Sequence, residues 1–295
     1  MGVIASYSRM TILQVLILAV VQGTCELLPI SSSAHVILAE KLMGLDPTAP
    51  HMTLLLVMLH TGTMFAVIAY FWRSWVDRYF DSVTSFWALA KLITVATAFT
   101  GVIGIALMLF IERVVLRGSA HAEVEHLFGN PYVIAAGLAT VGVMIILSAR
   151  REATADRHQS IGTYGAAWIG AVQGFCLPFR GFSRSGATIS SGLFLGLEKR
   201  QVAEFSFALA VVLTPAIIAK EGYRLLRAND GTLTVASGLF DLVWPSLLGM
   251  TFSFIAGLAA LRLLSRWLEH GRWQLFGYYC LAAAIFVLSA HRMFS

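Results

Sequence analysis

Long apolar runs separated by short polar segments recur along the whole chain. Six of them approach or reach the roughly 20 residues that an α-helix needs to cross the hydrocarbon core of a bilayer. These runs cover residues 51–72, 88–111, 132–147, 205–219, 239–264 and 275–294. The pattern predicts six membrane-spanning helices, and it leaves no stretch long enough for a separate soluble domain of useful size.

Two further regions have a different pattern, in which a polar segment rich in Gly, Pro and Ser separates two short apolar stretches. Residues 12–21 and 34–43 flank the first polar segment, and residues 164–171 and 187–197 flank the second. Each stretch is too short to cross the bilayer alone. Irregular backbone is tolerated at membrane depth only where it is buried in protein or lines a cavity. We therefore predict two re-entrant helical hairpins.

The two hairpin regions resemble each other in sequence. VQGTC at residues 21–25 matches VQGFC at residues 172–176, an offset of 151, and each is followed by a proline, Pro29 or Pro178. Such self-similarity is typical of a duplicated half-protein. An odd number of spans, three, lies between the hairpins, so the second copy enters the membrane from the opposite side, which is an inverted-topology repeat. We expect an all-α, polytopic single domain over residues 1–295, with repeats at about 10–147 and 160–295.

Composition supports a membrane protein and excludes other classes. Hydrophobic residues make up 58% of the chain and charged residues only 13%. The net charge of +5 would suggest a nucleic-acid partner in a soluble protein, but the Lys and Arg lie mostly in short loops. Membrane topology and lipid headgroups explain them, so no nucleic-acid partner is expected. Three cysteines without paired spacing indicate neither a disulfide framework nor a zinc site.

The basic residues also predict an orientation. The topology places eleven Lys and Arg on one side and eight on the other. By the positive-inside tendency the richer side is cytoplasmic, and both termini lie outside. The loop over residues 112–131 then lies outside as well. A metal site is one interpretation of four residues in it, and a mixed-charge interfacial loop is the ordinary one; the residues are His121, Glu123, Glu125 and His126.

The second polar segment has the composition of an anion site. Residues 181–188, GFSRSGAT, hold one Arg, three hydroxyls and two glycines. The planar guanidinium of Arg184 matches phosphate oxygens, and a helix beginning at Ala187 would direct its positive end into the same space. The alternative is structural: Arg184 pairs with a carboxylate such as Glu26, and the serines cap the helix.

The first polar segment holds groups suited to phosphoryl chemistry. Gln22 and Glu26 are four residues apart, so a helix places both on one face. Three serines (31–33) and His35 follow Pro29. A nucleophilic hydroxyl with an adjacent acid or base is the set that phosphoryl transfer requires. His60, in the next apolar run, either lines the same cavity or packs in the core.

Together these motifs resemble the bacterial undecaprenyl-diphosphate phosphatase family, also called bacitracin-resistance proteins. The resemblance covers essentially the whole chain and rests on Gln22-x-x-x-Glu26, Pro29-x-Ser31-Ser32-x-x-His35 and Gly181-x-Ser183-Arg184-Ser185-x-x-Thr188. It implies hydrolysis of the C55 isoprenoid diphosphate to the monophosphate that carries cell-wall precursors, and hence bacitracin resistance. It also implies a bacterial inner-membrane location, with the active site open to the periplasm.

The resemblance implies a role for each matched residue. Glu26, Ser32, His35 and Arg184 are the catalytic set. The expected substrate-binding residues are Gln22, Ser31, Arg180, Gly181, Ser183, Ser185 and Thr188. Two positions depart from the family pattern: Arg180 stands where proline usually precedes Gly181 and adds a second positive charge, and Ala34 stands where glycine is common before the histidine.

Several alternatives remain open at this point. In one mechanism Ser32 attacks, with His35 or Glu26 as the base; in another, Glu26 and a divalent cation activate water. The resemblance implies dependence on a cation, Mg²⁺ or Ca²⁺, with Glu26 as a ligand.

Membrane lipids and a second copy of the chain in a homodimer are further expected partners. The rival functions are a polyprenyl-phosphate flippase or anion transporter without hydrolysis, and a non-catalytic scaffold.

Overall fold

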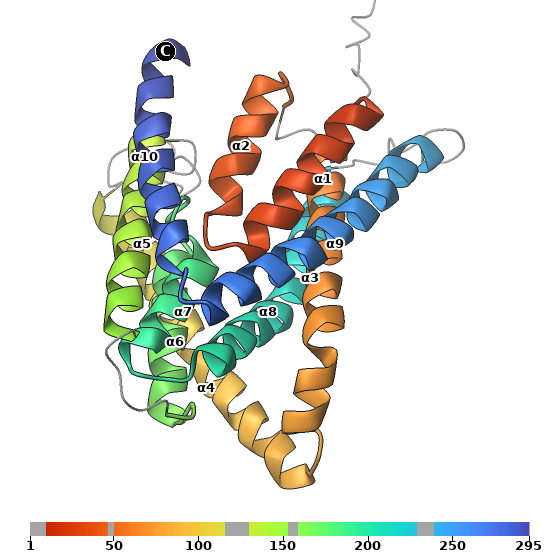
Figure 1. Cartoon of the computed structure of the whole chain (residues 1–295). Coiled ribbons are helices and arrows are strands. Elements are labelled where there is room, and N and C mark those ends of the chain that lie inside the picture. The colour runs from red at the N-terminus through yellow and green to blue at the C-terminus, as the bar shows by residue number, and fades with distance from the viewer. Residues whose placement is uncertain (1–9, 47–49, 116–129, 153–158, 229–238, 295) are drawn as a thin grey trace, which may run out of the picture.

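The computed structural model describes residues 10–46, 50–115, 130–152, 159–228 and 239–294. Within these ranges every regular element is a helix, and Figure 1 shows their arrangement. The helices are α1 (Ile12–Leu27), α2 (Ser32–Leu42), α3 (Pro50–Tyr79), α4 (Val83–Phe110), the π-helical turn η1 (Ile111–Val115), α5 (Pro131–Glu152), α6 (Thr163–Cys176), α7 (Arg184–Phe194), α8 (Lys199–Ala228), α9 (Leu239–Glu269) and α10 (Gln274–Phe294).

Five of the six predicted spans fall within one helix each, and the sixth, residues 88–111, follows α4 and ends on the first residue of η1. Four helices are long and apolar enough to cross a membrane, α3, α4, α5 and α9, while α1 and α10 are shorter apolar helices. Several helices extend beyond the predicted runs; α3, for example, continues to Tyr79. The reason is that residues 73–78 contain three charged side chains but no helix breaker, so the apolar run ends before the helix does.

The two regions with interrupted patterns each form a pair of short helices, α1 with α2 and α6 with α7. Thr11 and Gln14 form a capping box at the start of α1. The helix ends at Leu27, two residues before Pro29, which cannot continue a helix. The expected start of α7 at Ala187 is wrong: the helix begins at Arg184 because Ser183 is its N-cap.

The first helix of each pair packs closely on a long helix of the other half. A Cβ added to Gly23 of α1 would lie 2.6 Å from the carbonyl oxygen of Ser253 in α9. A Cβ on Gly174 of α6 would lie 2.7 Å from the carbonyl oxygen of Thr100 in α4. Glycine is therefore needed at both positions for the backbones to approach, as is common between membrane helices. Elsewhere α5 packs along both α10 and α7.

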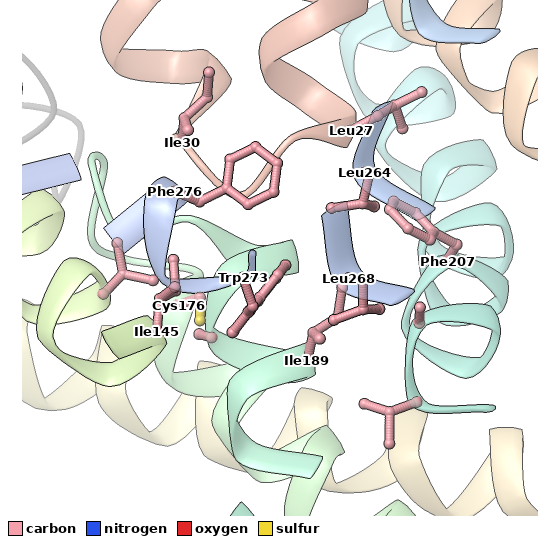
Figure 2. Packing of buried hydrophobic residues seen from close by; sticks show 14 of the residues in the cluster. Leu27, Ile30, Ile145, Cys176, Ile189, Phe207, Leu264, Leu268, Trp273 and Phe276 are labelled. Atoms are coloured by element: carbon pink, nitrogen blue, oxygen red, sulfur yellow. The ribbon is translucent and has the colours of Figure 1, made fainter. Parts of the chain in front are cut away.

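The main core lies where the two helix pairs meet. Figure 2 shows Leu27 and Ile30 from the first pair and Cys176 and Ile189 from the second, in one cluster of buried residues. Trp273 and Phe276 at the start of α10 fill the space beside them, with ring centroids 5.7 Å apart. The Trp273 indole N–H donates to Ser148 Oγ at 3.1 Å, so this buried polar group has a partner. The core thus fixes the two helix pairs against each other.

Candidate active site

The connections inside the two helix pairs lie against each other. We call residues 28–31 the first connection and residues 177–183 the second connection. Ser185 Oγ, just after the second connection, donates to the Leu28 carbonyl of the first at 3.3 Å. Gly186 is so close to Pro29 that an added Cβ would lie 3.2 Å from the proline Cβ. Residues about 150 positions apart in the chain are thereby brought to one place.

The first connection ends in an unusual backbone conformation at Ser31. Its φ of 68° lies in the left-handed region, which costs a non-glycine residue about 1–2 kcal/mol. The Ser31 carbonyl oxygen lies 2.7 Å from His35 Nδ1, and Ser31 Oγ lies 3.3 Å from Ser33 Oγ. The chain changes direction at Ser31, and α2 begins at the next residue, Ser32. The backbone N–H groups in the first turn of a helix have no partner within the helix.

The second connection also contains a residue with a positive φ, but two positions before its last residue, Ser183. Gly181 has a φ of 89° and contacts the Ile134 carbonyl, so a side chain would not fit there. Ser183 Oγ accepts the Gly186 N–H at 3.3 Å and caps α7. Arg184 is the first residue of that helix. Two helix N-termini, each with a positive dipole end, therefore converge on one polar site.

Glu26 is the centre of this site. Its Oε2 accepts Ser32 Oγ at 2.5 Å and Gln22 Nε2 at 3.4 Å. Its Oε1 accepts Arg184 Nη2 at 3.2 Å. The Arg184 and Glu26 side chains keep 23% and 20% of their surface exposed, so a ligand can reach the pair. The structural interpretation of Arg184 is confirmed by its ion pair with Glu26, and anion binding by the accessible guanidinium stays a prediction.

His35 contacts a residue that the sequence did not identify. His35 Nε2 lies 2.7 Å from the Tyr279 hydroxyl, and the two rings stack with centroids 5.7 Å apart. Because the Ser31 carbonyl can only accept, Nδ1 carries the proton and Nε2 accepts from Tyr279. Tyr279 lies 244 residues from His35 and stands in an apolar run beside another tyrosine. Interfacial aromatics are common in such runs, so no sequence signal distinguished it.

Three hydroxyls predicted to bind substrate are buried and bonded to protein groups. Ser183 caps α7, and Ser185 bonds Leu28. Thr188 Oγ1 lies 2.6 Å from Ser206 Oγ and donates to the Arg184 carbonyl at 2.8 Å. Their contact with a diphosphate stays a prediction. The same holds for Arg180, which lies near enough to the buried Glu40 to interact with it electrostatically.

The described residues provide only part of a metal site. No cluster of three or more His, Cys, Asp or Glu side chains suited to a metal occurs among them. His60 lies near enough to Glu26 for an electrostatic interaction, and its Nδ1 bonds the Leu56 carbonyl at 2.8 Å, which leaves Nε2 available. Substrate oxygens would have to complete a shell begun by Glu26. The other possible metal site, in the loop over residues 112–131, consists of His121, Glu123, Glu125 and His126. These four residues lie outside the described residues.

Comparison with known proteins gives a consistent result over nearly the whole chain. A protein of Acinetobacter baylyi named undecaprenyl-diphosphatase 2 is 59% identical over 283 residues, covering 95% of this chain and 98% of that protein. An undecaprenyl-diphosphatase of Thermus thermophilus is 34% identical, covering 94% and 96%, and one of Desulfosudis oleivorans is 33% identical, covering 91% and 94%. The family model for bacitracin resistance protein BacA matches residues 15–286. In this chain Glu26 bonds both Ser32 and Arg184. The chain belongs to the bacitracin resistance protein BacA family.

Proposed function

We propose that this protein hydrolyses undecaprenyl diphosphate to undecaprenyl phosphate and inorganic phosphate, which recycles the lipid carrier of cell-wall synthesis and confers bacitracin resistance. Family membership and the names of the relatives support this function. The single observation that carries it is the chain of contacts from Ser32 through Glu26 to Arg184. A hydroxyl, a base and a phosphate-binding cation are the groups that phosphoryl transfer requires.

Ser32 is the nucleophile in this proposal. Glu26 accepts the Ser32 proton across the 2.5 Å contact, and Oγ attacks the terminal phosphorus. The bond from phosphorus to the bridging oxygen breaks, its electron pair stays on that oxygen, and undecaprenyl phosphate leaves. Water then attacks the phosphoserine, so that inorganic phosphate is released and Oγ recovers a proton. Arg184 binds the transferring oxygens with its planar fork of donors.

A divalent cation, Mg²⁺ or Ca²⁺, is the expected cofactor. Glu26 would hold it together with diphosphate oxygens, and His60 Nε2 is a further candidate ligand, because His60 lies near enough to Glu26 to interact with it electrostatically. The cation would neutralise part of the diphosphate charge. Because the protein offers few ligands, we expect the cation to bind far more tightly with a diphosphate than alone, which calorimetry with and without a non-hydrolysable diphosphate would test.

The membrane arrangement is part of the proposal: six spans, two re-entrant hairpins and an inverted repeat. The packing of Gly23 on α9 and of Gly174 on α4 supports it, because equivalent residues of the two halves contact equivalent helices of the other half. The protein lies in the bacterial inner membrane with the site open to the periplasm, and it associates as a homodimer. Labelling of single introduced cysteines from each side of vesicles tests the topology, and light scattering in detergent tests the dimer.

The hydrolysis itself is tested by phosphate release. Purified protein with undecaprenyl diphosphate and Mg²⁺ or Ca²⁺ should release one phosphate per lipid, and Glu26→Gln should abolish this release while leaving lipid binding. No release from the wild-type protein, with binding intact, would instead favour a carrier.

The nucleophile is tested separately. Acid quenching during turnover of a substrate labelled in its terminal phosphate should trap label on Ser32, and Ser32→Ala should show neither label nor turnover. Turnover by Ser32→Ala would overturn the covalent route and leave activated water as the nucleophile.

A further inference from the structure

A charged cavity lies between α3, α8 and α9, apart from the catalytic groups. It has a volume of about 230 Å³ and opens between the last turns of α3 and α9 and the first turns of α8. Its lining shares no residue with the site around Glu26. α7 separates the two places: it starts at Arg184, and its eleven residues span about 16 Å before the chain reaches α8. The cavity is therefore a second polar site in an otherwise apolar molecule.

Glu204 of α8 lines this cavity and is completely buried, with a side chain that is 0% exposed. Its Oε1 accepts Ser74 Oγ at 2.6 Å and Arg200 Nε at 3.0 Å. Its Oε2 lies 3.4 Å from Arg78 Nη1, and within the described ranges neither of these two atoms has a hydrogen bond of good geometry. The carboxylate is thus balanced by charge, while part of its hydrogen-bonding capacity remains unused.

The groups around Glu204 carry more positive than negative charge. Arg78 and Arg200 share its single carboxylate, and Lys199 also lines the cavity. Glu269 is the other acidic lining residue; it is exposed, and we assign it no contact with a ligand. Three cations and two carboxylates leave one positive charge in excess. Because unbalanced charge in a partly buried place is costly, a bound anion would stabilise this cluster.

Arg200 is the group best placed to bind such an anion. Its side chain is 61% exposed although Glu204 fixes its Nε. Among the described residues Glu204 and Ser74 accept from Nε and Nη2, and a guanidinium has five N–H donors, so further donors can reach phosphate oxygens. Arg200 also lies in the first turn of α8, where the backbone N–H groups and the positive end of the helix dipole favour an anion.

The rest of the wall is apolar and lies at the depth of lipid headgroups. Phe71 and Leu268 line the cavity and belong to the main core, in which Figure 2 shows Leu268. α3 and α9 are long and apolar enough to cross a membrane, and the cavity lies at the ends of both. The ends of such helices meet the headgroup region. A free phosphate would contact only the charged groups, whereas a phospholipid would cover the apolar wall as well.

We propose that this cavity binds an anionic phospholipid, with the lipid phosphate on Arg200 and the start of an acyl chain along Phe71 and Leu268. The predicted topology puts these helix ends on the cytoplasmic side, so the lipid belongs to the cytoplasmic leaflet, where anionic lipids attract basic residues. Bound there, the lipid contacts α3, α8 and α9 at once. The binding involves no hydrolysis and is therefore independent of the proposed function.

Native mass spectrometry of the purified full chain in detergent tests the site. The apparent Kd of the first bound lipid is measured for phosphatidylglycerol, which is anionic, and for phosphatidylcholine, which has the same phosphodiester but no net charge. The wild-type protein should bind phosphatidylglycerol about fivefold more tightly, the effect of roughly one basic residue near an anionic lipid. Arg200→Gln should lower this ratio to about one, because it removes the excess charge. Arg150→Gln removes an exposed arginine in the last turn of α5, outside the cavity, and should keep the wild-type ratio.

A second variant leaves the charged cluster intact, since Arg200→Gln also removes a bond to Glu204. Ser265 is half-buried in the wall on α9, so Ser265→Phe fills the cavity and should also lower the ratio to about one. An unchanged ratio in folded Arg200→Gln, or in Ser265→Phe if Arg200→Gln unfolds, would overturn the proposal and leave the Glu204 cluster as a structural tie between α3 and α8.

Inorganic phosphate distinguishes a lipid headgroup from a free anion as the ligand. Excess inorganic phosphate should not displace phosphatidylglycerol from the wild-type protein, because it gains nothing from the apolar wall. Complete displacement that depends on Arg200 would overturn the assignment to a lipid and make the cavity a site for free phosphate.

Discussion

The two helix pairs are built alike but carry different chemistry. In each pair a helix ends in a short connection, and a second helix starts at a polar residue, Ser32 in one and Arg184 in the other. Gln22 and Gln173 occupy equivalent positions, and both are buried. Gln22 donates to Glu26, whereas Gln173 donates to Thr100 of α4 at 3.2 Å. The same residue thus serves the active site in one half and helix packing in the other.

The decisive difference lies four residues further along each helix. Glu26 corresponds to Leu177 at the repeat offset, and a Cβ on Gly104 would contact the Leu177 side chain at 2.7 Å. Ser183, Ser185 and Thr188 of the second pair are buried and bonded to protein groups. Ser32 instead bonds a carboxylate that is partly exposed. Two similar helix pairs therefore carry an asymmetric site. In the proposed mechanism the first pair supplies the reactive groups, and the second supplies the Arg184 guanidinium that would bind phosphate.

Removing the carboxylate should have the largest effect, because Leu177 cannot replace it. We expect Glu26→Gln to lower kcat for undecaprenyl diphosphate by about a thousandfold or more, since the proton acceptor for Ser32 is lost. Phosphate release under saturating substrate measures the effect. Glu269→Gln, an exposed carboxylate at the end of α9, is the control and should retain activity. Comparable losses in the two variants would contradict the assignment.

Replacing Arg184, the residue that the second half of the chain contributes to the site, should have the next largest effect on activity. Arg184→Lys keeps the charge but removes the planar fork, so we expect kcat/KM to fall about a hundredfold. Arg262→Lys on the exposed side of α9 is the matched control. If Arg184→Lys retained full activity, the guanidinium would act only as a distant charge, and the proposed phosphate contact would be wrong.

Tyr279 should contribute through His35 rather than directly. Tyr279→Phe keeps the stacked ring but removes the hydroxyl bonded to Nε2, and we expect kcat to fall about tenfold, the effect of roughly one hydrogen bond. The positioning role is tested with His35→Asn: in that background Tyr279→Phe should cause no further loss. Two independent losses that multiply would show that Tyr279 acts separately.

The equivalent glutamines provide the finest test of the asymmetry. Gln22→Leu should lower kcat several-fold, since Glu26 loses one donor, which is worth about 1 kcal/mol. Gln173→Leu should leave activity intact and change the free energy of unfolding by less than about 1 kcal/mol, because Gln173 Oε1 already lacks a partner and Thr100 keeps its bonds to backbone carbonyls. The opposite order of effects on activity would contradict the assignment of the two halves.

Much of this site was predictable because its residues are close in sequence. Gln22, Glu26, Ser32 and His35 lie within fourteen positions of one helical hairpin, and a polar cluster in apolar sequence indicates function. The start of α7 was misplaced by three residues because the apolar pattern resumes only at Ala187, whereas the Ser183 cap decides where the helix begins. Tyr279 could not be found, because nothing in a linear pattern brings α10 beside α2.

The sequence by itself determined the helices, the duplication and the types of group available for chemistry. Those properties depend on hydrophobic periodicity and local spacing, which are written along the chain. The tertiary structure alone decided which group bonds which: Glu26 rather than His35 accepts from Ser32, and Tyr279 bonds His35. Such contacts depend on distances between residues far apart in the chain, and packing of the two helix pairs against each other sets those distances.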